Sequence, residues 1–167
     1  LDTQGLLRCN GLLTPLEAVA LRAHVDSLVE QGKAAVGSGG APFLELFGPV
    51  MGRRDRVDVL LPLDEVVLGA VRKILRQVGP VISHAVGGEH ATICELSALV
   101  SDPGASAQPV HHDTEFGRCP RRISVLTALQ DISSEMGPTV LWPGTNTPAW
   151  HAWFSQRGEE LEALLEG

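Results

Sequence analysis

The stretch ATICELSALVS, residues 91–101, is the longest run in the chain with the composition of a β-strand. It is rich in apolar and β-branched residues and ends at a turn-forming Asp-Pro-Gly. Further short runs follow it, separated by Gly and Pro: QPVHHD (108–113), RRISVLTALQDI (121–132) and GPTVLWPGT (137–145). From about Ile82 onward, this pattern predicts antiparallel strands joined by turns.

Two helices are predicted before these strands. Thr14-Pro15-Leu16-Glu17 provides a capping residue, a proline at the first helical position and a glutamate three residues after the cap, so a helix should begin here. Gly32 and the Gly-rich GSGGAP (37–42) should end this unit in a loop. A second helix is expected from Asp64 to Gly79-Pro80. Helices followed by a series of strands indicate a mainly β fold with flanking helices, of the jelly-roll or cupin-like type.

Length and composition favour one domain over residues 1–167, with a helical part at about 1–80 and a β core at about 81–154. The formal net charge of −7 argues against a nucleic-acid partner. Three cysteines without a CxxC pair suggest a reducing, intracellular location, which we expect to be the cytoplasm. We expect no membrane span, because no apolar run approaches the required ~20 residues.

The most informative polar cluster is His111-His112-Asp113. If a strand continues through it, His111 and Asp113 project to one face and His112 to the other. An imidazole and a carboxylate that converge, joined by a third ligand, form the facial triad that holds Fe(II) with open coordination positions. A polar strand end would look the same, so the motif alone is weak evidence.

The motifs around His111 and Asp113 strengthen the prediction of an Fe(II) site. ELSALVSDPGASAQPVHHD followed by ISVLTALQDISSEMGPTVLWPGTN resembles the phytanoyl-CoA dioxygenase family of Fe(II)- and 2-oxoglutarate-dependent oxygenases. In that family a strand, a Pro-Gly-Ala turn, a glutamine and the His-x-Asp pair occur in this order, and a Gly-Pro, an apolar strand and a Pro-Gly-Thr come later. The N-terminal GLLTPLEAVALRAHVDSLVE is similar to the family's opening helix.

The resemblance implies a double-stranded β-helix in which His111 and Asp113 bind Fe(II) and 2-oxoglutarate is the co-substrate. It further implies that O2 and a small organic substrate react there, with decarboxylation to succinate and hydroxylation of a C–H bond. Because related halogenating enzymes have a small residue where Asp113 stands, the aspartate favours hydroxylation. Glu95, Ser97 and Thr127 are candidates to line the co-substrate pocket, although an exposed polar sheet face would show the same pattern.

Some expected features have no counterpart. The family's late histidine ligand and the arginine that binds 2-oxoglutarate are expected beyond Gly167, so we expect the β core to be incomplete at its C-terminal end. Asn146 stands where the family has a histidine, and His151 is predicted to lie in a loop rather than to be the third ligand. The alternatives are a non-catalytic family member that serves as a binding or structural subunit, and a hydrolytic zinc site.

Overall fold

The computed structural model describes residues 1–86, 88, 90–113 and 122–166. Its first helix, α1 (Pro15–Gly37), begins where the sequence predicts. Thr14 Oγ1 accepts a hydrogen bond from the Glu17 N–H at 3.3 Å, and the Glu17 carboxylate accepts one from the Thr14 N–H at 2.7 Å. This reciprocal capping satisfies backbone groups that the first helical turn leaves unpaired.

Helix α1 continues through Gly32 and ends at Gly37, the first residue of GSGGAP, so the predicted break at Gly32 is wrong whereas the Gly-rich run does end the helix. A Cβ atom at position 32 would lie 2.6 Å from Phe47 Cζ, much closer than van der Waals contact allows. Phe47 follows the short helix α2 (Phe43–Leu46), is 1% exposed and stacks on Phe43 with ring centroids 4.9 Å apart. Gly32 is therefore a packing residue inside the helix and does not terminate it.

Helix α3 (Glu65–Val86) also begins at its predicted cap and runs past its predicted end. Asp64 Oδ1 accepts from the Val67 N–H at 3.0 Å, and Asp64 Oδ2 lies 2.7 Å from Nε2 of His24 on α1. The hydrogen bond from Val67, with a smaller contribution from His24, lowers the pKa of the Asp64 carboxyl. Pro80 lies inside α3 and removes one backbone donor, but the helix continues beyond it.

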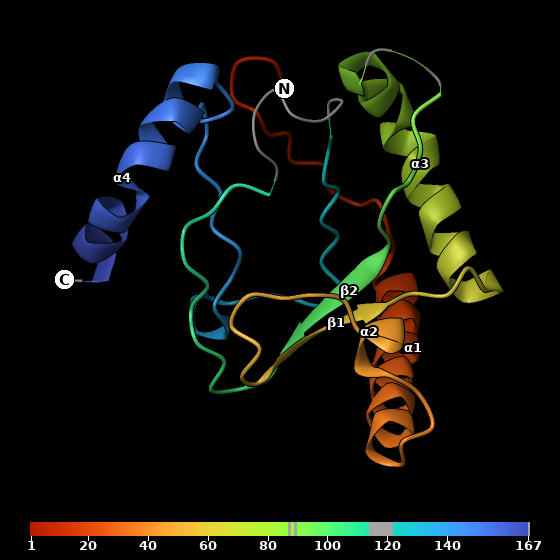
Figure 1. The fold of residues 1–167 in the computed structure, drawn as a ribbon. Coiled ribbons are helices and arrows are strands. Elements are labelled where there is room, and N and C mark those ends of the chain that lie inside the picture. Colours follow the sequence, from red (N-terminus) through yellow and green to blue (C-terminus); the bar gives the residue numbers. More distant parts are fainter. Residues whose placement is uncertain (87, 89, 114–121, 167) are drawn as a thin grey trace.

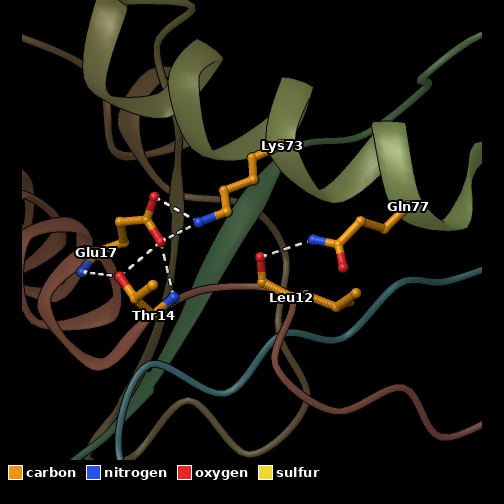
Figure 2. A network of polar contacts seen from close by, with 5 residues as sticks. All are labelled: Leu12, Thr14, Glu17, Lys73 and Gln77. Atoms are coloured by element: carbon orange, nitrogen blue, oxygen red, sulfur yellow. Dashed lines mark hydrogen bonds and ion pairs between the residues drawn. The ribbon is translucent and has the colours of Figure 1, made fainter.

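A second contact joins α1 to α3 (Figure 2). Lys73 of α3 forms an ion pair with the Glu17 carboxylate, with Nζ 2.6 Å from Oε1, and Gln77 Nε2 donates to the Leu12 carbonyl at 3.1 Å. The Lys73 hydrogen bond, reinforced by those from Thr14, lowers the pKa of Glu17 to about 2. The network fastens the start of α1 to the middle of α3.

The sheet consists of β1 (Arg56–Leu60) and β2 (Ser97–Ser101), paired antiparallel with Asp58 opposite Leu99. Buried Val25 and Val29 of α1 pack with Phe47 and Val59 to form the core. Helix α4 (Pro148–Glu166) lies on the other side of the molecule from α1 and α3, as Figure 1 shows. The sequence predicted β2 within residues 91–101, whereas β1 was missed inside a region expected to be helical.

The predicted mainly β jelly roll is wrong, because most of the regular structure is helical and the described residues contain just the two-stranded sheet. Residues 82–86 belong to α3 and residues 148–154 to α4. The runs at 122–132 and 138–142 form no β-ladder. The short 3-10 helix Ser134–Met136 lies between them. Several apolar side chains of the two runs face solvent, with Leu126 69% and Val140 74% exposed, whereas Leu129 packs against the core. Cys119 and the first residue of the predicted 121–132 strand lie outside the described residues.

Candidate functional site

The side chains of His111 and Asp113 come together, although residues 110–113 form no regular strand. His111 Nε2 lies 3.5 Å from Asp113 Oδ1. The other ring nitrogen, Nδ1, lies 2.8 Å from the carbonyl oxygen of Pro109. Because a carbonyl can only accept, this contact requires a proton on Nδ1, so Nε2 is the nitrogen that carries the free lone pair of a neutral ring.

Asp113 has a partner of its own. Ser124 Oγ donates to Asp113 Oδ2 at 3.3 Å, so the two carboxylate oxygens face different groups. The side chains of His111 and Asp113 are 37% and 69% exposed. The described residues do not form the rolled β scaffold expected around the pair, and both side chains are partly exposed.

These donors fit a divalent transition metal. An imidazole nitrogen and a carboxylate oxygen are the donors of the 2-His-1-carboxylate site, and a ligating histidine usually donates its other ring N–H to a backbone carbonyl, as His111 does to Pro109. Two donors about 2.1 Å from one metal at a right angle lie about 3 Å apart, and the observed 3.5 Å needs a small adjustment. No third His, Cys, Asp or Glu completes such a group within the part of the chain that the structure describes.

His112 contacts α4 instead. Its ring meets the His151 ring edge-on with centroids 4.9 Å apart, and the Phe154 ring at 5.7 Å. Burial, and to a lesser extent the proximity of His112, lowers the pKa of His151.

The prediction that His151 lies in a loop is therefore wrong, because it lies in the first turn of α4. The signal for this helix is Thr147-Pro148, which repeats the Thr14-Pro15 pattern at the start of α1. Thr147 Oγ1 accepts from the Trp150 N–H at 3.2 Å. Trp150 in turn stacks on Trp153 and meets Trp142 edge-on, so three half-buried tryptophans attach α4 to the segment before it.

Of the residues considered for the co-substrate pocket, Thr127 lines a cavity of about 520 Å³ between residues 9–19 and 126–131. Glu95 is exposed ahead of β2, and Ser97 is the first residue of that strand, opposite Leu60. Neither is part of the lining of this cavity. Thr127 is three residues from Ser124, so their Cα atoms are at most about 11 Å apart. The cavity lining therefore includes a residue three positions along the chain from the partner of Asp113.

Arg56, the first residue of β1, has a structural role. Its guanidinium donates to Ser101 Oγ at 3.0 Å and to the carbonyl oxygens of Met51, Gly52 and Ser106 at 3.3, 3.2 and 2.8 Å. Gln108 Nε2 adds a bond to the Met51 carbonyl at 3.1 Å. No sequence pattern signals this role, because the Ser101 hydroxyl and the Ser106 carbonyl lie 45 and 50 residues from Arg56 along the chain.

Within the described residues, no helix has the length and apolar character that a membrane span requires. No curated protein and no solved structure matches the chain significantly. The family model described as phytanoyl-CoA dioxygenase matches residues 1–160, nearly the whole chain. That family is generally dioxygenase-like and falls within the Fe(II)- and 2-oxoglutarate-dependent oxygenases. The chain therefore belongs to the phytanoyl-CoA dioxygenase family.

Proposed function

We propose that the protein is an Fe(II)- and 2-oxoglutarate-dependent dioxygenase that hydroxylates a small organic molecule. His111 and Asp113 would supply two of the metal ligands. The observation that carries the proposal is the 3.5 Å approach of His111 Nε2 to Asp113 Oδ1, with the ring oriented by the Pro109 carbonyl. Family membership supports the same chemistry.

Each residue around the pair has a distinct role in this proposal. The Pro109 carbonyl keeps the proton on His111 Nδ1, so that Nε2 is the donor atom. Ser124 holds Asp113 Oδ2, which leaves Oδ1 facing the histidine. When bound, Fe(II) with 2-oxoglutarate supplies the activation of O2 that hydroxylation of a C–H bond needs. Because a carboxylate occupies the position that halogenating relatives leave to chloride, we propose hydroxylation as the outcome.

The cavity beside Thr127 is the proposed position for 2-oxoglutarate or substrate. Its volume of about 520 Å³ is typical of small-molecule sites. Its lining combines apolar Leu126 and Leu129 with the Thr127 hydroxyl and the Gln130 amide. Glu95 and Ser97 remain proposed contacts of the co-substrate, although neither lines this cavity.

The test is turnover of 2-oxoglutarate to succinate by the Fe(II)-loaded protein. D113A should abolish succinate formation, because one ligand and the partner of His111 are both lost. D26A removes a carboxylate on α1 whose partner is Arg22, at 3.8 Å, and should leave turnover unchanged. Equal succinate formation by D113A and the unmodified protein would contradict the proposal.

A non-catalytic role is the second candidate, and one observation favours it. Asn146, at the position where the family has a histidine, is bound into the N-terminal segment. Its Nδ2 lies 3.5 Å from the Asp2 carbonyl, and its side chain lies against Gly5 so closely that a Cβ there would be 2.6 Å from Asn146 Cγ. Asn146 thus serves packing, as expected of a chain that keeps a family scaffold for binding. Absence of succinate formation together with undiminished Fe(II)-independent binding of 2-oxoglutarate would favour this candidate.

A further inference from the structure

Residues 106–113, the segment that carries the proposed ligands, are held by two different parts of the molecule. At its start, Arg56 holds the Ser106 carbonyl and Gln108 holds the Met51 carbonyl, so residues 106–108 are tied to the loop ahead of β1. Within it, the His112 ring packs against α4. Because residues 110–113 form no ladder with another strand, backbone hydrogen bonds of a sheet do not fix the spacing of His111 and Asp113.

The His112 ring is held by packing. Its Nδ1 is buried and has no hydrogen-bond partner among the described residues. A buried nitrogen without a partner is unfavourable, so the edge-on contacts with His151 and Phe154 must offset that cost. Helix α4, which carries His151 and Phe154, is itself held in place, because Trp142, Trp150 and Trp153 attach its first turns to the preceding segment.

We infer that His151 and Phe154 are positioning residues for the metal site: by holding the His112 ring, they fix the backbone that carries His111 and Asp113. The inference rests on the proposed function, since it assigns these residues to the same metal. A ring held between two ligands restrains both of their Cα atoms, because consecutive Cα atoms have a fixed spacing of 3.8 Å. Helix α4 therefore restrains the segment that carries His111 and Asp113, as pairing with neighbouring strands would do in a complete sheet.

The first arm of the test measures Fe(II) affinity by anaerobic titration. H112A and F154A should weaken binding by about 10- to 100-fold, the usual effect of losing a group that orients a ligand. H112F keeps an aromatic ring without a titratable nitrogen and should bind within about threefold of the unmodified protein. Q156A is the control, because Gln156 is an exposed residue of the same helix. The double variant H112A/F154A should lose no more affinity than H112A, because both changes break one contact.

The second arm needs no metal. In the metal-free protein, the ring ¹⁵N and ¹³C resonances of His111 report its contacts with Pro109 and Asp113. F154A should shift or broaden these resonances, whereas Q156A should leave them unchanged. A structural role confined to α4 would move neither His111 nor Fe(II) affinity, and H112F would then rescue nothing.

The outcomes separate the two proposals. If the unmodified protein binds no Fe(II) but F154A still perturbs His111, the metal assignment fails and the positioning contact stands. If the unmodified protein binds Fe(II), and H112A and F154A bind it equally well with unchanged His111 resonances, the inference is overturned and the proposed function stands. A loss of affinity in H112F as large as that in H112A would also overturn it, because packing would then not be the property that matters.

Discussion

Residues 1–101 contain a core of buried apolar side chains, whereas residues 122–147 contain none that is fully buried. In the first region, Val25, Phe47 and Val59 are 3%, 1% and 3% exposed and form one core between α1 and the sheet. In the second, Leu126, Val140 and Leu141 are 69%, 74% and 58% exposed. Both regions contain strand-like apolar runs, so composition does not separate them. What separates them is whether a second element with a matching apolar face lies opposite.

The largest effect is expected from F47A, which removes the ring at the centre of the first region. Phe47 is 1% exposed and packs against Phe43 and Gly32. Truncating a buried phenylalanine leaves a cavity and costs about 3–5 kcal/mol. Urea denaturation should show this loss of unfolding free energy. A loss below about 1 kcal/mol would contradict the conclusion that Phe47 lies at the centre of the core.

A smaller effect is expected from G32A, and its sign is informative. Alanine is favoured over glycine in a helix by about 1 kcal/mol, but its Cβ would lie 2.6 Å from Phe47 Cζ. Overpacking of this kind costs about 1–3 kcal/mol, so we expect net destabilisation. The matched control is G69A on α3, where no atom lies within 4 Å of the added Cβ and stabilisation is expected. Stabilisation by both changes would refute the packing role of Gly32.

Acid should weaken the link between α1 and α3. The Glu17 carboxyl has a pKa of about 2 when folded against its usual value of 4.5, chiefly through the Lys73 hydrogen bond. A lowered folded pKa gives stability that is present above pH 4.5 and is lost as the pH falls toward 2. E17Q should flatten that part of the pH profile of unfolding, whereas E30Q on the same helix should not. An unchanged slope in E17Q would contradict the assignment.

The smallest effects belong to the second region. L126T and V140T alter side chains that are 69% and 74% exposed, so each should change the unfolding free energy by less than about 0.5 kcal/mol. Thermal and urea unfolding of the two variants would measure this. Destabilisation above about 2 kcal/mol would show that these side chains are buried in solution, and the contrast between the regions would disappear.

Local signals predicted the parts of the fold that depend on neighbours in sequence. The capping box at Thr14 and the cap at Asp64 each placed a helix start correctly, because caps satisfy backbone groups within a few residues. The predicted break at Gly32 was wrong because that glycine packs against Phe47, a contact between separate elements. The jelly roll was wrong because strand-like runs form a sheet only with hydrogen-bonding partners, which residues 122–132 do not have.

The same division applies to the candidate site. Spacing by two residues predicted that His111 and Asp113 lie together, and they do so in an irregular segment as they would in a strand. Their roles as ligands stay a prediction. The contacts of Asp113 with Ser124 and of His112 with His151 were not predictable, because both join segments that no local pattern relates. The Thr147-Pro148 cap, by contrast, carried a readable signal for α4.

Anaerobic Fe(II) titration of the unmodified protein, H111A and D113A tests the metal assignment most directly. The unmodified protein should bind one Fe(II) per chain, and each variant should lose this binding while keeping its helical circular dichroism. Equal Fe(II) binding by all three proteins, or no binding by the unmodified protein, would contradict a metal site at His111 and Asp113.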